Sequence, residues 1–199
     1  MILRSALLSS LTWLDHGFGT RHAPLSQDGM ASLKQIHSAV VLDAASAGPA
    51  GEGDALVTAH GGLAVSVRTA DCYPILLADA RTRTVAAVHA GWRGTVARIV
   101  AATVAKMGGH PADIYAAIGP GVGVCCYEVG EDVARLFGLD APGNVDLAAA
   151  NRALLIAAGV PESNIELLNA CTRCDAARFH SYRRDRDSAG RMISYICPL

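Results

Sequence analysis

Aromatic and charged side chains are scarce in this sequence. Aromatic residues make up 5% of the 199 residues and Asp, Glu, Lys and Arg together 18%, whereas apolar residues make up 51%. So large an apolar fraction excludes an intrinsically disordered chain, and the shortage of rings predicts a core of Ala, Val, Leu and Ile. The length fits one domain, so we expect residues 1–199 to form a single domain.

The chain also lacks an excess of charge of either sign and any long apolar run. Its 17 basic and 18 acidic residues give a formal net charge of −1, and no basic patch interleaved with aromatic residues is present, so we expect no nucleic-acid binding. Apolar stretches such as Ile99–Ala105 are far shorter than the ~18 residues that cross a bilayer. Met1–Leu14 has no secretory pattern. We therefore expect a cytoplasmic protein without a membrane segment.

The spacing of apolar residues predicts strands and helices that do not alternate strictly. Strands are expected at residues 33–42, with His37 near the middle, and at 55–58, 63–68, 74–78, 84–89, 113–118, 165–169 and 192–197. Helices are expected at 96–107, 129–137 and 147–158, and Ala44–Gly53 is expected to be a loop. This order favours an α+β fold, a single domain with mixed β-sheet layers flanked by helices.

Three potential metal ligands stand at the ends of neighbouring predicted strands. They are His37 in KQIH, Cys72 in RTADCYP and His89 in AVHAGWRG. Two imidazoles and a thiolate suit zinc, but the gaps between them are much too long for a zinc-finger knuckle, so the fold would have to assemble such a site. The alternative is that each is an ordinary buried side chain.

The segment that follows His89 is typical of a ligand-binding turn. The strand is followed by Ala-Gly-Trp-Arg-Gly-Thr, which opens a helix. Gly91 and Gly94 would let a ligand approach the backbone, and Arg93 offers a fork of donors at a helix N-terminus, which favours an anion such as phosphate. A plain turn with Thr95 as the helix N-cap explains the same residues, and both interpretations stay open.

Five motifs carry a resemblance to a known family: RTADCYPILLAD, AVHAGWRGT, AAIGPGVGVCCYEVG, FHSYRRD and GRMISYI. In this order they resemble the YfiH family, whose members are variously called laccase-domain proteins, multicopper polyphenol oxidases, purine nucleoside phosphorylases and peptidoglycan editing factors. The resemblance runs from about Asp15 to the C-terminus, and Asp71–Gly94 is its most specific part. It implies a YfiH-like α+β domain over residues 1–199.

The resemblance also implies a site and an activity. A zinc ion would be held by His37, Cys72 and His89, which match the family's ligands and would also be the catalytic residues. The implied reactions are phosphorolysis of adenosine, inosine and methylthioadenosine and hydrolytic deamination of adenosine. The expected partners are therefore a purine nucleoside and phosphate. Copper is reported for the family, but zinc is the cofactor expected here.

The chemistry of such a site assigns further roles. Zinc with three protein ligands keeps a fourth position open and lowers the pKa of a water there to about 7, which would supply a nucleophile for C6 of adenosine. Phosphorolysis needs cationic forks to hold phosphate, and Arg21, Arg68 and Arg93 are the expected substrate-binding residues. Asp71 and Asp54 are the nearest candidates for managing protons.

Two cysteine pairs and one arginine run stand outside this expected site. Cys125-Cys126 is interpreted as packing or turn residues, because vicinal cysteines rarely bond to each other. The CTRC motif, Cys171–Cys174, has the spacing of a redox motif without its βαβ context, which favours a structural role. The run SYRRDRD, Ser181–Asp187, is typical of a solvated face, with phosphate binding as the alternative.

Two other classes of function would use the same residues. A metal-free cysteine hydrolase would have Cys72 as its nucleophile and His89 as the base, and metal content discriminates it from the zinc enzyme. A non-enzymatic role, as a structural zinc domain or a peptidoglycan editing factor acting through a partner, would show an intact zinc site without turnover. A multicopper oxidase is not expected, because the seven histidines include no His-x-His pair.

Overall fold

Fourteen strands and six α-helices make up the fold over residues 1–199, as described by a computed structural model. The strands are β1 (Ile2–Leu3), β2 (Leu14–Gly19), β3 (Ala31–Lys34), β4 (Val41–Asp43), β5 (Gly48–Glu52), β6 (Ala55–Thr58), β7 (Val65–Thr69), β8 (Tyr73–Asp79), β9 (Val85–Ala90), β10 (Ile114–Ile118), β11 (Glu128–Val129), β12 (Gly143–Asn144), β13 (Ile165–Leu167) and β14 (Met192–Pro198). The helices are α1 (Ala6–Ser9), α2 (Trp92–Val96), α3 (Ile99–Met107), α4 (Glu131–Leu136), α5 (Leu147–Ala157) and α6 (Tyr182–Asp185). None of them combines the length and apolar character that a membrane span needs.

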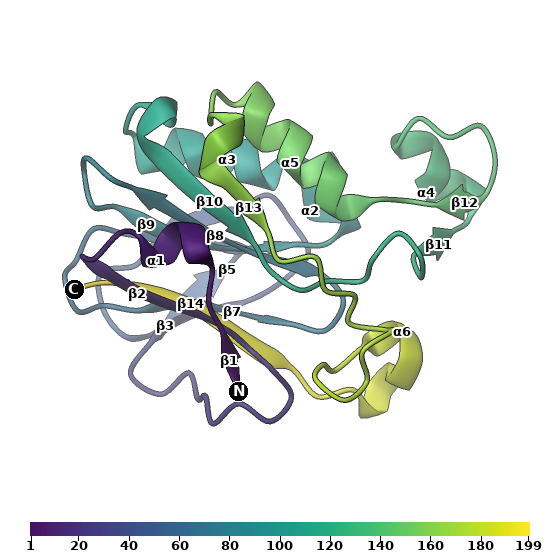
Figure 1. Ribbon diagram of the computed structural model, residues 1–199, viewed down its shortest axis with the longest axis horizontal. Coiled ribbons are helices and arrows are strands. Elements are labelled where there is room, and N and C mark those ends of the chain that lie inside the picture. Colours follow the sequence, from purple (N-terminus) through teal and green to yellow (C-terminus); the bar gives the residue numbers. More distant parts are fainter.

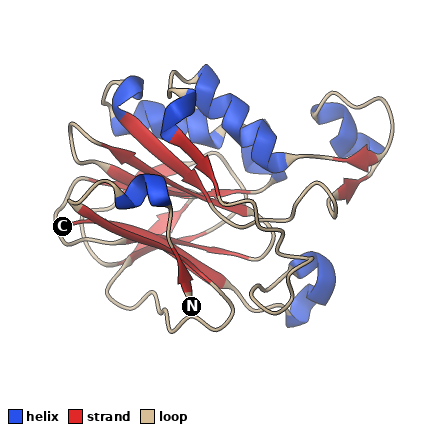
Figure 2. Cartoon of the chain, viewed as in Figure 1, coloured by secondary structure: helices blue, strands red, loops and turns tan.

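The strands form two six-stranded sheets that lie face to face, with helices over the outer face of one (Figures 1 and 2). One sheet has the order β1-β2-β14-β7-β3-β5 and the other the order β13-β10-β8-β9-β6-β4. Both are mixed, because most pairs are antiparallel whereas β3 with β5 and β7, β13 with β10, and β4 with β6 are parallel. The α+β class with mixed sheets flanked by helices, expected from the sequence, is confirmed.

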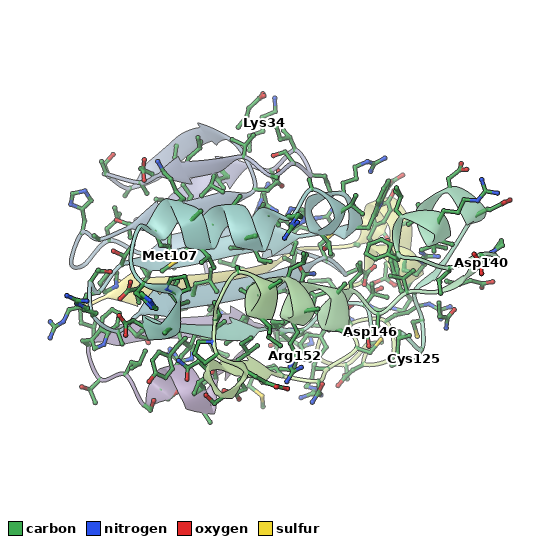
Figure 3. All side chains as sticks on the ribbon, turned by 90° about the horizontal axis from the view of Figure 1, so that it is seen from above. Lys34, Met107, Cys125, Asp140, Asp146 and Arg152 are labelled. Carbon is green, nitrogen blue, oxygen red and sulfur yellow. The ribbon has the colours of Figure 1, made fainter.

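Strand β8 shows how the layers are held together. Ile75 and Leu77 pack in a core shared with α3 and α5, which lie side by side over the sheet (Figure 3). Leu76 and Ala78 pack in a second core between the two sheets. A strand buried on both faces gives a continuous apolar run rather than an alternating pattern. This rigid central layer positions the loops that follow at its edge.

The strand expected at residues 33–42 is wrong, because this segment forms two short strands in different sheets. β3 and β4 flank a crossing loop, and His37 lies in that loop with a φ of 59° rather than within a strand. The cause is the carboxylate of Asp54. It accepts hydrogen bonds from the backbone N–H groups of Ile36, His37 and Ser38 at 3.3, 3.0 and 2.5 Å. These groups therefore bond to a side chain instead of a neighbouring strand.

The helix expected at residues 96–107 is two helices. α2 begins earlier and ends at Val96, and Arg98 then adopts a left-handed conformation with a φ of 62° before α3 begins. Thr95 as N-cap is wrong, because Gly91 occupies that position and the Thr95 hydroxyl donates to the Gly91 carbonyl at 2.9 Å. The first helix after His89 is consequently one short turn that starts beside the strand end.

Two further boundaries differ from the sequence predictions. The loop expected at Ala44–Gly53 contains β5, which pairs in parallel with β3 through backbone groups at the sheet edge, where its Gly and Pro residues are tolerated. The helix expected at residues 129–137 begins only at Glu131, because Val129 pairs with Gly143 in the two-stranded sheet β11-β12. This small sheet and α4 project from one end of the molecule, at the right in Figure 1.

Candidate active site

The side chains of His37, Cys72 and His89 meet although they come from three separate segments. His37 lies in the crossing loop after β3, Cys72 in the turn between β7 and β8, and His89 near the end of β9. Their ligand atoms, one ring nitrogen from each histidine and the cysteine Sγ, lie within 4.8 Å of one another. The two imidazole rings are 4.9 Å apart in an edge-to-face arrangement. The fold therefore brings the three expected ligands together.

The antiparallel pairing of β8 with β9 accounts for the approach of Cys72 to His89. Pro74 is paired with His89 in the register, so the residue before β8 and the residue after β9 also lie next to each other. That second residue is Gly91, and a Cβ atom there would stand 2.8 Å from Cys72 Sγ and 3.5 Å from His37 Cδ2. The second distance is ordinary van der Waals contact, but the first is too short, so only glycine leaves this space free for the thiol.

A buried carboxylate, Asp54, orients two of the three ligands. It is fully buried, and its Oδ1 accepts from the His37 backbone N–H and lies 2.8 Å from His89 Nδ1. Burial by itself would raise the pKa of Asp54, but the hydrogen bonds from His89 and Ser38 lower it to about 2. An ionised carboxylate can only accept, so His89 Nδ1 carries a proton toward Asp54, and Nε2 is the ring nitrogen that can bind a metal once its own proton is lost. Asp54 is thus a positioning residue.

The electrostatics of the cluster favour a thiolate. Burial opposes ionisation of Cys72, but hydrogen bonds with His37 and His89 outweigh it and lower the pKa of the thiol to about 7. Burial likewise lowers the pKa of His89, whereas Asp54 and Cys72 outweigh that effect and raise it to about 9. The thiolate is the form that attacks electrophiles and binds metals.

The turn that carries Cys72 has an unusual backbone. Asp71 has a φ of 87°, a backbone conformation that residues other than glycine rarely adopt. Its carboxylate accepts from the Thr172 hydroxyl at 2.6 Å and from the Arg183 backbone N–H at 2.5 Å, and its carbonyl accepts from the Val122 N–H at 2.8 Å. These three hydrogen bonds hold the turn in place. A strained backbone conformation persists only where such surrounding contacts maintain it.

A cavity of about 730 Å³ opens over the three ligands. Arg68 and Arg93 line it, as does Asp71, whereas Arg21 lies outside it and donates to the Ala176 carbonyl. The lining carries six cationic side chains: Lys34, Arg68, Arg93, Arg183, Arg186 and Arg191. Four of these are not among the expected substrate-binding residues. The run SYRRDRD contains two of these four, Arg183 and Arg186, and was the sequence signal that could have identified them. Its alternating charges are equally typical of a solvated face.

Three aromatic side chains also line the cavity: Trp92, Tyr127 and Tyr182. The Arg93 guanidinium lies 4.3 Å from the centre of the Trp92 ring, and that of Arg183 lies 5.2 Å from the centre of the Tyr127 ring. Burial and the nearby Cys72 raise the pKa of Tyr127 to about 12, so its hydroxyl stays protonated. Tyr182 is 44% exposed and is therefore accessible to a ligand.

The donor set fits a single metal ion. Two imidazole nitrogens and a thiolate are ligands for zinc, and tetrahedral zinc with bonds of ~2.0–2.3 Å needs ligand atoms ~3.5 Å apart. The ligand atoms of His37, Cys72 and His89 lie within 4.8 Å of one another, so side-chain movements on the order of 1 Å would bring them to that spacing. The hydrogen bond from His89 to Asp54 is the outer-shell partner that metal-binding histidines usually have.

Solved structures with the same arrangement of strands define the class of fold. The hypothetical protein YfiH of Bacillus licheniformis superimposes with a TM-score of 0.88 and 26% identity, covering 94% of both chains. YlmD of Geobacillus stearothermophilus gives a TM-score of 0.88 and 27% identity, covering 99% of this chain and 96% of its own. The chain therefore has the YfiH fold.

The family follows from the sequence itself. Residues 19–198 match the family described as multi-copper polyphenol oxidoreductase laccase, and the chain belongs to that family. It is 46% identical over 183 residues to a purine nucleoside phosphorylase of Deinococcus radiodurans, covering 85% of this chain and 70% of the relative. It is 42% identical over 160 residues to adenosine deaminase RL5 of an unknown prokaryotic organism, covering 72% of this chain and 61% of the relative. The resemblance to the YfiH family is confirmed.

Proposed function

We propose that the protein is a zinc-dependent purine nucleoside phosphorylase that acts on adenosine, inosine and methylthioadenosine and also deaminates adenosine. The observation that carries the proposal is the presence of a His-Cys-His donor set and six cationic side chains in one cavity. The relatives named purine nucleoside phosphorylase and adenosine deaminase support a nucleoside as the substrate. The cavity of about 730 Å³ lies within the ~300–1,000 Å³ typical of small-molecule sites.

The cationic side chains are proposed to bind phosphate. Arg68 and Arg93 are exposed residues that line the cavity, and a guanidinium fork matches two phosphate oxygens at once. In phosphorolysis a phosphate oxygen forms a bond to C1′ of the ribose while the bond from C1′ to the purine nitrogen breaks. The base leaves with its electron pair and takes up a proton, which gives ribose 1-phosphate and the free base.

The exposed side chain of Tyr182 is the proposed stacking surface for the purine. The Trp92 and Tyr127 rings each have an arginine over them, whereas Tyr182 is 44% exposed. A flat ring beside cationic forks suits a ligand with an aromatic base and a phosphate partner. This arrangement would place the sugar between the base and the phosphate-binding arginines.

The metal is proposed to be held by His37, Cys72 and His89. When bound, zinc would act as a Lewis acid and lower the pKa of a water ligand. Asp54 keeps His89 in the tautomer that presents Nε2, and Gly91 keeps the space beside Cys72 open. Of the two carboxylates expected to manage protons, Asp71 lines the cavity, and we assign to it the transfer of a proton from the attacking water to the amino group of adenosine, which then leaves C6 as ammonia.

Replacing His89 by alanine tests the proposal directly. We expect the untagged wild-type protein to release base from inosine only when phosphate is present and to release ammonia from adenosine. His89→Ala should lose both activities and the metal of this site, as followed by mass spectrometry of bound metals. His60→Ala, which removes an exposed histidine, is the matched control and should keep both. Full turnover by metal-free protein would contradict the proposal.

Neutralising Arg93 should weaken phosphate binding more than nucleoside binding. Loss of a charge-assisted hydrogen bond predicts a rise of about tenfold in KM for phosphate in Arg93→Gln. The nucleoside KM and the deamination rate, which need no phosphate, should change little. Arg81→Gln, an exposed arginine in the turn between β8 and β9, is the control. Equal losses of activity in phosphorolysis and deamination would show that Arg93 stabilises the fold and does not bind phosphate.

A metal-free cysteine hydrolase remains the second candidate, and one observation favours it. Cys72, His89 and Asp54 form a chain of hydrogen-bonding side chains, with the pKa of Cys72 at about 7, as in cysteine-dependent catalysis. Alkylation with iodoacetamide distinguishes the candidates. A protein that carries metal at this site should protect Cys72, whereas a hydrolase should lose a peptidase or amidase activity as Cys72 alone is modified.

A further inference from the structure

Four of the six cysteines converge at a place outside the candidate active site. Cys125 and Cys126 follow the glycine-rich turn after β10, and Cys171 and Cys174 lie in the loop after β13. Their four Sγ atoms all lie within 4.8 Å of one another, with Cys174 at 3.7 Å from Cys125 and 3.3 Å from Cys126. The sequence interpretation gave Cys125-Cys126 as packing or turn residues and Cys171–Cys174 a structural role, and it did not connect the two pairs because it considered each alone.

We propose that these four cysteines bind a zinc ion, which makes a second metal site separate from the His37–Cys72–His89 cluster. Tetrahedral zinc with Zn–S bonds of ~2.3 Å needs sulfur atoms ~3.8 Å apart, and four thiolates are a common structural zinc set. The distances from Cys174 Sγ to the sulfur atoms of Cys126 and Cys125, 3.3 and 3.7 Å, are close to that spacing. The pair Cys171 and Cys174 also has the C-x-x-C spacing found in such sites.

The geometry favours one ion over the other occupants of a four-cysteine site. In an iron–sulfur cube the four thiolates lie at separate corners of the cluster and are held far apart, whereas these four sulfur atoms all lie within 4.8 Å of one another. Two disulfides would separate the sulfurs into two bonded pairs, whereas Cys174 stands close to both Cys125 and Cys126. The cysteines border a cavity of about 210 Å³, lined by Cys125 and Cys171, through which an ion can enter.

The two cysteine loops are already joined by their backbones. The Thr172 N–H donates to the Gly121 carbonyl at 2.9 Å, and the Gly123 N–H points at Cys171 Sγ at 3.2 Å. An N–H that donates to a metal-binding thiolate is a typical outer-shell contact. A Cβ atom on Gly123 would come within 3.2 Å of Cys171 Cβ, so this glycine lets the loops approach. The two loops are thus held next to each other by contacts other than those among the four sulfur atoms.

A metal at this position would fix one wall of the active-site cavity. Thr172 lies between the two cysteines of the C-x-x-C pair, and its hydroxyl donates to Asp71, the residue before Cys72. The Arg184 guanidinium donates to the carbonyls of Thr172 and Arg173 and so ties the same loop to α6. Figure 1 shows α6 at the end of the molecule from which α4 and β11 project, and Figure 3 places Cys125 toward that end, near Asp146. The proposed role is therefore structural.

Metal content of the untagged protein, purified under reducing conditions, tests this proposal. We expect about two zinc ions per chain, one for each donor set. Cys171→Ser combined with Cys174→Ser should lose one of them, and His89→Ala should lose the other. Cys197→Ser, which removes the cysteine on β14 outside both clusters, is the control and should keep both ions. The zinc lost from each variant is counted separately. If the His37–Cys72–His89 cluster binds no metal, the zinc content of the four-cysteine site can therefore still be determined.

Two measurements on the His89→Ala protein, which keeps all four cysteines, avoid dependence on the folding of the double variant. Cobalt loaded in place of zinc should give the intense thiolate-to-metal absorption of a tetrahedral four-sulfur site. A thiol reagent should leave four more cysteines unmodified in the zinc-loaded protein than after chelation. Iron in place of zinc, a disulfide among the four cysteines of the reduced protein, or four thiols that react equally with and without metal would each overturn the proposal.

Discussion

Asp54→Asn should weaken metal binding at the His37–Cys72–His89 site although all three ligands remain in the chain. The carboxylate accepts from five donors, namely the backbone N–H groups of Ile36, His37 and Ser38, the Ser38 hydroxyl and His89 Nδ1–H. An asparagine NH₂ cannot accept. In one orientation of the asparagine side chain, its NH₂ group faces the Ser38 N–H, which loses its acceptor. In the other orientation the NH₂ group faces His89 Nδ1. The His89 proton must then lie on Nε2, which can no longer bind the metal.

The expected size of this effect follows from burial. Loss of an outer-shell carboxylate weakens metal binding by about 10- to 100-fold, and breaking a fully buried ion pair costs about 3 kcal/mol or more of stability. Competition with a chelator measures the first effect and urea unfolding the second. Asp43→Asn, an exposed carboxylate paired with Lys106, is the matched control and should change neither. Full metal retention in Asp54→Asn would mean that Asp54 serves the loop fold alone.

The central strands could be predicted from the sequence because their pattern is local. β6, β8 and β9 are short apolar runs bounded by turn residues, and each lies where the run predicts. The crossing loop at His37 could not be predicted in this way. Its backbone N–H groups bond to Asp54, which follows them by more than 15 residues and becomes their partner only after β6 packs. The side chain of Asp54, which is distant in sequence, therefore takes the place of a neighbouring strand as the hydrogen-bond acceptor for these N–H groups.

The candidate sites show the same division. His37, Cys72 and His89 could be named because they stand in motifs that resemble a family, whereas their mutual distances depend on the pairing of β8 with β9. The four-cysteine cluster lies in two loops that β10 and β13 bring together as parallel neighbours. Nothing in either cysteine pair indicates the other. The strongest available signal was the presence of two unassigned pairs in one chain.

Gly91→Ala should disturb the metal site through one added methyl group. Gly91 has φ and ψ of −82° and 176°, which alanine adopts without strain, so any effect comes from contact and not from the backbone. The new Cβ would stand 2.8 Å from Cys72 Sγ, and either the thiol or α2 must shift. Overpacking of this kind costs about 1–3 kcal/mol, and a displaced Sγ no longer meets the ring nitrogens of His37 and His89.

We therefore expect Gly91→Ala to stay folded but to lose most of its metal at this site and most of both activities. Gly130→Ala is a closely matched control, because Gly130 is also a helix N-cap with an extended backbone, φ −71° and ψ 171°, and no atom lies within 4 Å of its added Cβ. Metal titration and turnover of the two variants isolate the contact with Cys72. If both variants kept wild-type metal affinity, Cys72 would not be a ligand held in the observed position, and the cysteine-hydrolase candidate would gain support.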